Sequence, residues 1–272
     1  MGIVNVTPDS FSDGGKFSQT DAAVEHALNL ANQGAAILDI GGESTRPYSS
    51  AVEADQELER VIPVIEKLVA KTKTPISIDT SKSIVAAAAI AAGAEIINDV
   101  TGLQGDPKMI DIALQTGAGI CAMHMQGTPQ DMQDNPSYQD VTREIHGYLK
   151  QRKSFLIDAG VGPDKICLDP GIGFGKTHDH NLQLIRDCHQ FHDLGCPILI
   201  GHSRKGFISK LINANSIQTA TPSISQRDAG TLAITLKLAQ QGIQVIRVHE
   251  VANTIAALTI QHGLIKKSKS TG

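Results

Sequence analysis

The chain has 272 residues, 41% of them hydrophobic and 19% charged, which is enough for one large core. The formal net charge of −4 gives no basic footprint for nucleic acid or an anionic membrane, so we expect neither partner. The sequence has no apolar run of transmembrane length and no signal-peptide layout at its start. Its four cysteines follow no metal-type or redox-type spacing, and together these features predict a cytoplasmic protein.

Eight short apolar runs predict β-strands along the chain. They are hydrophobic on both faces, as parallel strands covered by helices are, rather than alternating between apolar and polar residues. In chain order the runs are residues 2–6, 36–40, 76–79, 95–98, 120–123, 166–169, 197–200 and 245–248.

Longer helical patterns fill the intervals between these runs. The first predicted helix covers residues 21–31, with Thr20 as its N-cap and Gly34 beyond its end. The others cover residues 54–69, where Pro63 is a candidate kink, and residues 84–92, 140–157, 225–240 and 251–260. Eight strands, with helical patterns after six of them and no linker between the units, predict a single-domain α/β protein, namely a (β/α)8 TIM barrel over residues 1–265 with a polar tail at 266–272. The alternative, a doubly wound sheet, usually needs fewer strands.

Polar residues occur where the predicted strands end. In a barrel of this type the active site lies at the C-terminal ends of the strands. A single Asp or Asn after a strand is more often a turn or helix-cap residue, but a polar residue after every run predicts a functional site at that rim. The residues concerned are Asn5, Asp39, Asp79, Asn98, His124, Asp169, His202, Arg247 and His249.

The chemistry of the rim indicates the kind of ligand. Carboxylates and amides suit a flat heterocycle that presents several N–H donors, and the rim supplies Asp79, Asn98 and Asp169. Cationic side chains suit a phosphate or carboxylate group, and candidates are Arg46, Lys205, Arg247 and His249. We therefore expect a substrate with a donor-rich ring at one end and an anion at the other.

Two polar connections, residues 7–19 and 41–52, are longer than a strand-to-helix turn requires. Their glycines and hydroxyl side chains can offer N–H and O–H groups to an anion. Loops over a barrel mouth are candidates for mobile lids, and a solvated surface loop is the alternative for either one.

Several familiar motifs are approached but not completed. In segment 171–177, a Walker A loop needs a glycine where Pro170 stands, and the dinucleotide fingerprint needs one where Lys176 stands, so we reject both. Zinc binding is not predicted either, because no third ligand is suitably spaced from the histidine pairs, which are His178 with His180 and His189 with His192.

Seven segments, spread over essentially the whole chain, resemble the dihydropteroate synthase family and follow that family's order. Two of them are the long connections after the first two strands, and their combination with a Ser-Arg-Lys segment is highly specific. The segments are residues 1–15 (MGIVNVTPDSFSDGG), 41–47 (GGESTRP), 78–82 (IDTSK), 97–99 (IND), 169–176 (DPGIGFGK), 201–206 (GHSRKG) and 247–249 (RVH).

The resemblance implies a transferase of folate biosynthesis. It would condense 6-hydroxymethyl-7,8-dihydropterin diphosphate with p-aminobenzoate to give 7,8-dihydropteroate and diphosphate, with Mg²⁺ as the cofactor. The resemblance further implies a homodimer, and inhibition by sulfonamides as mimics of p-aminobenzoate. The alternatives are a pterin- or folate-dependent methyltransferase, which would need a corrinoid partner, and a pterin-binding paralogue without catalysis.

The resemblance also implies roles for residues at matching positions. The pterin would be held by Asp79, Asn98, Asp169, Lys205 and Arg247, among which the catalytic residues would be Asp79, Asp169 and Lys205. The diphosphate would contact Asn5, Thr45, Arg247 and His249, and the metal ion would be associated with Asn5. The p-aminobenzoate would lie against Thr45, Arg46, Pro47, Phe174 and Ser203.

Overall fold

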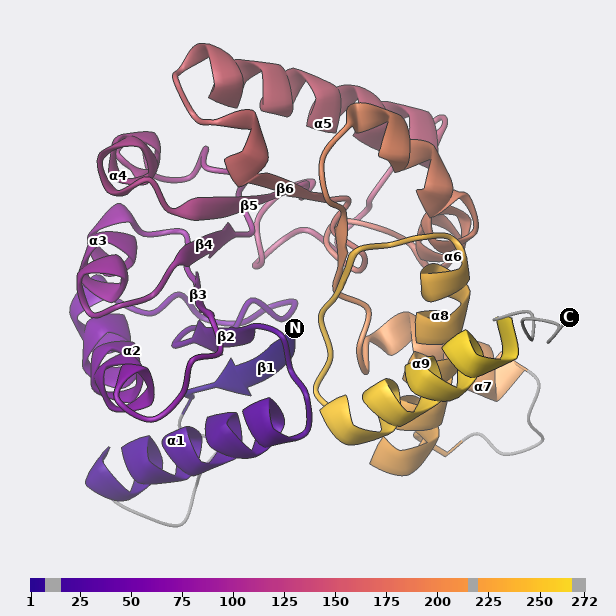
Figure 1. Cartoon of the computed structure of the whole chain (residues 1–272). Helices are drawn as coiled ribbons and strands as arrows, with labels where there is room; N and C mark the ends of the chain where they lie inside the picture. Colours follow the sequence, from indigo (N-terminus) through magenta and orange to yellow (C-terminus); the bar gives the residue numbers. More distant parts are fainter. Residues whose placement is uncertain (8–15, 215–219, 266–272) are drawn as a thin grey trace, which may run out of the picture.

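The computed structural model describes residues 1–7, 16–214 and 220–265, with strands at the centre and helices around them (Figure 1). Each of the eight predicted strands has a counterpart among the described residues, shifted by no more than two residues at either end. The strands are β1 (Gly2–Asn5), β2 (Leu38–Gly41), β3 (Ile76–Asp79), β4 (Ile96–Asp99), β5 (Gly119–Met123), β6 (Ile166–Asp169), β7 (Leu199–Ile200) and β8 (Val245–Ile246).

The strands are parallel and neighbour one another in chain order. Strands β1 to β6 form one hydrogen-bonded sheet, and β7 pairs with β8 in a second. Single bridges join the two pieces, between Leu168 and Ile198 on one side and between Gly2 and Val248 on the other. At the second joint the N–H of Ile3 donates to the carbonyl of Val248 at 3.0 Å. The ladder is therefore in two pieces, but the order of strands around the ring is that of a (β/α)8 barrel.

Helices connect the strands and cover the outside of the ring. They are α1 (Lys16–Asn32), α2 (Ala54–Val69), α3 (Ser83–Ala91), α4 (Met109–Thr116), α5 (Val141–Asp158), α6 (His178–Asp187), α7 (Gly206–Ala214), α8 (Ile224–Gln240) and α9 (Val251–Ile265), with the short 3-10 helices η2 (Pro163–Lys165) and η3 (Cys188–Leu194). Helix α2 has the predicted bounds and runs through Pro63.

The structure corrects some details of the helix prediction. Helix α1 begins at Lys16, so Thr20 lies inside the helix and its prediction as the N-cap is wrong. The apolar residues that pack this helix against the core, such as Val24 and Ala27, reveal that a helix is present but do not indicate at which residue it begins. His189 and His192, the second histidine pair noted in the sequence, lie in the 3-10 helix η3. The polar tail at 266–272 and most of the first long connection, residues 8–15, are outside the described residues.

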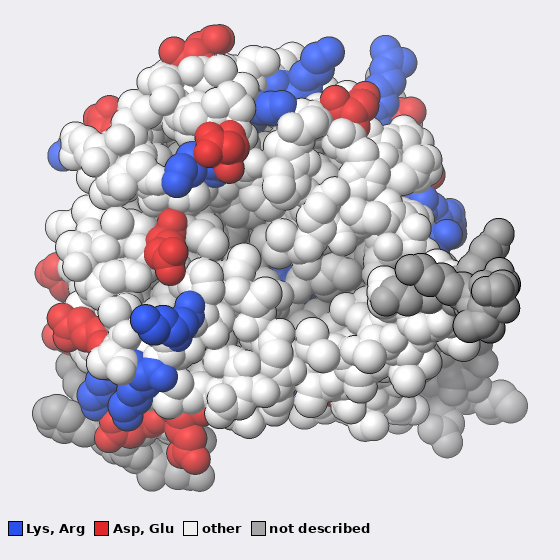
Figure 2. All heavy atoms as spheres, in the orientation of Figure 1, with Lys and Arg blue, Asp and Glu red and all other residues white. Residues whose placement is uncertain are grey.

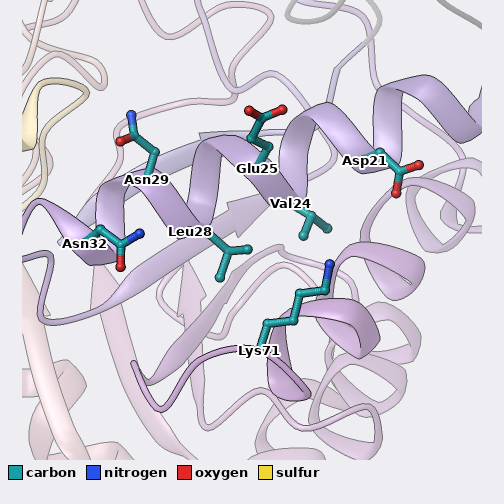
Figure 3. Close-up of a pocket in the computed structure, with 7 residues that line it drawn as sticks. All are labelled: Asp21, Val24, Glu25, Leu28, Asn29, Asn32 and Lys71. Atoms are coloured by element: carbon teal, nitrogen blue, oxygen red, sulfur yellow. The ribbon is translucent and has the colours of Figure 1, made fainter.

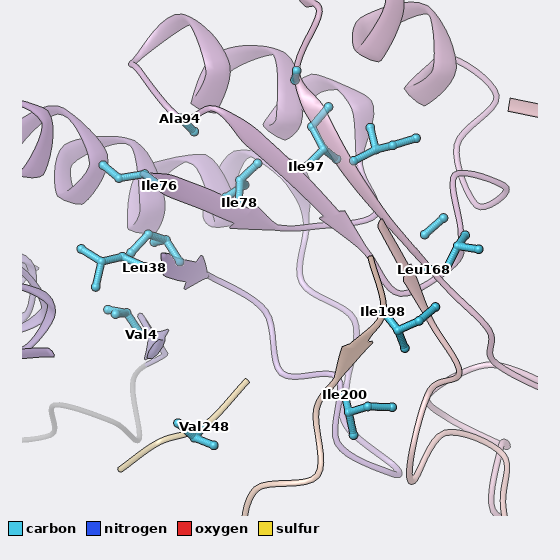
Figure 4. Close-up of a cluster of buried hydrophobic side chains, with 14 of the residues drawn as sticks. Val4, Leu38, Ile76, Ile78, Ala94, Ile97, Leu168, Ile198, Ile200 and Val248 are labelled. Carbon is cyan, nitrogen blue, oxygen red and sulfur yellow. The ribbon is translucent and has the colours of Figure 1, made fainter. Parts of the chain in front are cut away.

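The two faces of each strand have different roles. One face packs against the surrounding helices and forms the main hydrophobic core, with Val4, Leu38, Ile78, Ile97 and Leu168 among the buried side chains (Figure 4). Because side chains alternate along a strand, the residues between these point into the barrel. The inward-facing positions near the strand ends carry polar groups, and this places a set of hydrogen-bonding side chains at one mouth of the barrel.

The outer surface is mixed in charge. On the face shown in Figure 2, positive and negative side chains are interspersed, and most lie towards the edge of the view. Within the described ranges, the helices are too short or too polar to cross a membrane.

Candidate active site

Arg247 joins two carboxylates from neighbouring strands inside the barrel. Its Nε donates to Asp39 Oδ2 at 2.5 Å, and its Nη2 donates to Asp79 Oδ2 at 2.7 Å. The side-chain amide of Asn98 also donates to Asp39, at 3.2 and 3.4 Å from the two carboxylate oxygens. One network therefore links β2, β3, β4 and the segment after β8. It brings together three predicted pterin-binding residues and one residue, Asp39, that had no assigned role.

Burial controls the charges in this network. Burial raises the pKa of Asp79 to about 7 against the opposing effect of Arg247, and Asp39 raises it further. Burial alone would lower the pKa of the Arg247 guanidinium, but Asp39 and Asp79 together raise that pKa above its ordinary value. Arg247 is therefore a permanent cation, whereas the Asp79 carboxyl changes charge near neutral pH.

A second cluster joins the segments after β6 and β7. The Nζ of Lys205 donates to the carbonyl of Ile172 and lies 4.2 Å from the centroid of the Phe174 ring. The Oδ1 of Asp169 accepts a hydrogen bond of 2.7 Å from the N–H of Gly171. Burial lowers the pKa of Lys205 to about 7 although Asp169 raises it, and burial also raises the pKa of Asp169. Lys205, which is predicted to bind the pterin, is thus in direct contact with Phe174, which is predicted to bind p-aminobenzoate.

Glycines allow the loop after β6 to pass close to other protein atoms. Gly171 has a φ of +71°, and a Cβ there would lie 1.9 Å from the carbonyl oxygen of His124. Gly173 has a φ of +84°, and its Cβ would lie 2.7 Å from the side chain of Lys205. Only glycine is compatible with both the left-handed backbone and the close approach at these positions. In the structure these glycines leave room for the carbonyl of His124 and the side chain of Lys205.

Lys176 supports this loop, although the sequence did not assign it a role. The side chain is buried, and its Nζ donates to the carbonyl of Phe174 at 2.8 Å and lies 3.1 Å from Nδ1 of His124. Burial and the nearby Lys176 lower the pKa of His124 to about 3, so the imidazole is neutral and accepts this hydrogen bond. The hydroxyl of Tyr138 donates to the carbonyl of Gly175 at 2.9 Å. The backbone that carries Phe174 is therefore held by several side chains.

His202 does not belong to the polar ring. Its side chain is fully buried, with Nε2 lying 3.0 Å from the carbonyl of Thr231 and 3.2 Å from Oγ1 of Thr235. Both partners are on α8, outside the strands, so the prediction of a rim position is wrong for this residue. The side chain after β7 is turned towards the covering helix by its packing, and the sequence pattern carries no signal of that choice.

Ser203 and His249 form a third group at the mouth. The Oγ of Ser203 lies 2.9 Å from Nδ1 of His249. Burial lowers the pKa of His249 to about 3, and Arg204 and Arg247 lower it further. Arg46 also contributes to this lowering, which places the second long connection near His249. In this environment His249 is therefore a neutral hydrogen-bonding group.

The connection between β2 and α2 carries the remaining predicted residues. Thr45 is half-buried, whereas Arg46 and Pro47 are exposed. The tip of the connection is fastened by Tyr48, whose N–H donates to the carbonyl of Pro129 at 2.9 Å and whose hydroxyl donates to Asp134 at 3.0 Å. These partners lie in the connection after β5, so the loop extends along the rim of the barrel.

Two hollows lie near these elements. One has a volume of about 450 Å³ and lies behind the β2–α2 connection, between it and the segments that follow β3, β4 and β5. The other lies on the outside of the helical layer beside α1, and its lining consists of Asp21, Val24, Glu25, Leu28, Asn29, Asn32 and Lys71 (Figure 3). The second contains none of the strand-end residues, and we assign it no part in the site.

Comparison with known proteins identifies relatives over most of the chain. The model of a family described as pterin binding enzyme matches residues 1–249. The chain is 43% identical over 260 residues to the dihydropteroate synthase of Escherichia coli strain K12, covering 96% of this chain and 89% of that protein. Dihydropteroate synthase from Xanthomonas albilineans has been solved with 4-aminobenzoic acid (TM-score 0.89, 46% identity, 97% and 92% of the two chains). The same enzyme has been solved with 7,8-dihydropteroate (TM-score 0.86, 44% identity, 97% and 92%).

Proposed function

This chain belongs to the dihydropteroate synthases of the pterin-binding enzyme family, and we propose how its residues carry out that reaction. As a transferase of folate biosynthesis it condenses 6-hydroxymethyl-7,8-dihydropterin diphosphate with p-aminobenzoate, and it releases 7,8-dihydropteroate and diphosphate. The observation that carries the proposal is the set of inward-facing acceptors Asp79, Asn98 and Asp169 beside the cations Arg247 and Lys205. The methyltransferase alternative is not retained, because the relatives that match nearly full length are synthases.

The pterin ring is assigned to the inner part of the mouth. Its N–H donors suit the carboxylates of Asp79 and Asp169, since charge-assisted hydrogen bonds are stronger than neutral ones. Asp79 receives a hydrogen bond from Arg247 through Oδ2. A bound ring offers this carboxylate new donors, while Asp39 retains Arg247. In this arrangement Lys205 and Arg247 would lie beside the ring.

The reaction needs positioning and electrostatics rather than a protein nucleophile. Departure of the diphosphate leaves a positive charge that the electron-rich dihydropterin can delocalise, and the carboxylates of Asp79 and Asp169 stabilise that charge. Arg247 stabilises the departing anion, with Thr45 and Asn5 as further contacts. His249 can donate a hydrogen bond to the diphosphate, and a nearby anion would oppose the lowering of its pKa by burial and by Arg204 and Arg247.

The amine is assigned to the outer part of the mouth. Arg46, Pro47, Phe174 and Ser203 would contact p-aminobenzoate, so that its nitrogen attacks from the rim. The guanidinium of Arg46 suits the carboxylate of this substrate. Sulfonamides mimic p-aminobenzoate, and we expect them to compete with it at these residues. One relative, the dihydropteroate synthase of Yersinia pestis, has been solved in complex with a sulfonamide drug.

Mg²⁺ is the proposed cofactor at the diphosphate end. This ion usually keeps several waters and takes one or two protein oxygens together with phosphate oxygens of the substrate. The half-buried amide of Asn5 ends β1 and supplies one such oxygen at the mouth. In the part of the chain that the structure describes, no group of three His, Cys, Asp or Glu side chains could hold a metal. This donor set fits an ion that arrives with diphosphate, and when bound the ion would neutralise charge on the leaving group.

A homodimer in the cytoplasm is the proposed state of the protein. Helix α9 contains no Lys, Arg, Asp or Glu, and it exposes Ile260 and Leu264, which share one face. Exposed apolar residues that cluster on one element mark interaction surfaces. Light scattering after size exclusion measures the mass, and a change to monomer in Leu264→Lys would support this helix as the interface.

Diphosphate release is the experiment that tests the function. The dihydropterin diphosphate is incubated with and without p-aminobenzoate, and with and without Mg²⁺, and both products are measured. Metal-dependent release with formation of dihydropteroate supports the proposal. Release without the amine supports ionisation before attack, whereas tight pterin binding with no release under any condition would indicate a non-catalytic binder.

A further inference from the structure

We propose that Glu43, Lys82 and Glu57 form an ion-paired group that positions the β2–α2 connection for the amine substrate. The inference rests on the proposed function, because that connection carries Thr45 and Arg46. The Nζ of Lys82 donates to Glu43 Oε2 at 2.5 Å and to Glu57 Oε2 at 2.6 Å. We call these three residues the Lys82 ion group.

The Lys82 ion group joins three separate elements. Glu43 lies at the start of the connection, Glu57 lies in the first turns of α2, and Lys82 lies between β3 and α3. The second oxygen of Glu43 accepts a hydrogen bond of 2.9 Å from the N–H of Val52, near the other end of the same connection. One carboxylate therefore ties both ends of the loop to each other and to the base of the next strand–helix unit.

A hollow lies behind part of the β2–α2 connection. The hollow of about 450 Å³ lies directly beneath it, and its lining includes Glu43, Ser44, Thr45, Ser49 and Lys82. A loop that covers a hollow has few packing contacts to define its position, so its polar anchors have a larger effect. The anchors at the base are the Lys82 ion group and Arg60, which donates to the carbonyl of Gly42 at 2.6 Å, and the tip is held by Tyr48. Of the two anchors at the base, only the Lys82 ion group includes a side chain of the connection itself, that of Glu43.

The two carboxylates of the group have different roles. Glu57 is fully buried, and its Oε1 has no hydrogen-bond partner among the described residues, so it depends on Lys82 for compensation of its charge. Glu43 is only half-buried and belongs to the loop. Loss of Lys82 therefore endangers folding as well as loop position, whereas loss of the Glu43 charge leaves the Lys82–Glu57 pair in place and acts on the loop.

Glu43→Gln is therefore the test variant, and steady-state kinetics for both substrates is the measurement. We expect the KM for p-aminobenzoate to rise roughly tenfold, because small displacements of a positioning loop have large effects on productive binding. The KM for the dihydropterin diphosphate should rise by much less, because Thr45 is only one of the residues assigned to that substrate, and the thermal midpoint should stay close to that of the parent chain. A structural role alone would lower the thermal midpoint and would not separate the two substrates.

The matched control is the ion pair between Lys67 and Asp21, which lies on the outer side of α2 at 2.7 Å. Lys67→Met breaks this pair and should change neither KM. Lys82→Met should raise the KM for p-aminobenzoate at least as much as Glu43→Gln, with a loss of thermal stability. In the Lys82→Met background, Glu43→Gln should add little, because both changes remove the same contact.

Two results would overturn the inference. One is an unchanged KM for p-aminobenzoate in Glu43→Gln, and the other is an equal rise in the KM for both substrates. Either result leaves the proposed function intact as long as the parent chain forms dihydropteroate. A parent chain that forms none overturns the proposed function, and this inference with it.

Discussion

Asp79→Asn should stabilise the folded protein while it impairs catalysis. Burial raises the pKa of Asp79 from its ordinary value of 3.8 to about 7. A carboxyl with a raised folded pKa binds its proton more tightly in the folded state, so its contribution to stability is present at low pH and is lost as the pH rises through about 7. With these two pKa values, about 2.5 kcal/mol of unfolding free energy is lost between pH 5 and pH 8. Asparagine does not ionise, so the variant avoids this loss.

Denaturant unfolding of the parent chain and the variant at both pH values measures this effect. The free energy of unfolding of Asp79→Asn, relative to the parent chain, should rise by about 2.5 kcal/mol from pH 5 to pH 8. Its turnover should fall by roughly two orders of magnitude or more, because a neutral amide stabilises the developing positive charge less well. Asp21→Asn is the control, since Asp21 is exposed and Lys67 lowers its pKa, so this variant gains no stability as the pH rises. Parallel pH profiles for the parent chain and Asp79→Asn would refute the reasoning.

Three further changes probe the second cluster and its loop. Asp169→Ala should reduce kcat by orders of magnitude with little loss of folding, and near-normal turnover would contradict its assigned role. Lys205→Ala should raise the KM for both substrates in steady-state assays, since Lys205 contacts the Phe174 ring and lies beside the pterin position; a change confined to thermal stability would argue against this. Gly171→Ala should lower the free energy of unfolding by about 2 kcal/mol or more, because its Cβ would meet the carbonyl of His124 in a left-handed backbone. An unaltered denaturation midpoint would show that the loop can shift at little cost.

The barrel was predictable from the sequence because its strands are short, apolar and followed by polar residues. Strand β3 illustrates this, since residues 76–79 have the predicted bounds and Asp79 ends the run. Asp39 illustrates the limit. An acidic residue inside an apolar run was recognised as part of the rim, but its bond to Arg247 spans more than two hundred residues of sequence. No local pattern contains such a long-range pairing.

The direction of a side chain at a strand end was equally hidden. Asp169 and His202 both stand at the ends of apolar runs, but their side chains have different partners. Asp169 accepts a hydrogen bond from the N–H of Gly171, whereas the His202 ring contacts the carbonyl of Thr231 on α8. Packing by the covering helix decides between these outcomes. Charge states were hidden for the same reason. The sequence suggests that His249 and Lys205 are cations, but burial lowers their pKa to about 3 and about 7, so His249 is neutral.

These charge states explain how one mouth can accept a diphosphate and also promote its departure. Inside the barrel, Arg247 is hydrogen-bonded to two carboxylates, those of Asp39 and Asp79, so this part of the interior has a negative balance when both are ionised. If the pterin binds at the proposed position, a ring that becomes positively charged would be stabilised there more than an uncharged ring. This attraction between the carboxylates and the ring would strengthen only as the diphosphate leaves. It would therefore lower the energy barrier to ionisation of the substrate rather than only tighten substrate binding. The charge of Arg247 is balanced by Asp39 and Asp79, and burial lowers the pKa of Lys205 to about 7, so neither cation would strongly oppose a positive charge on the ring.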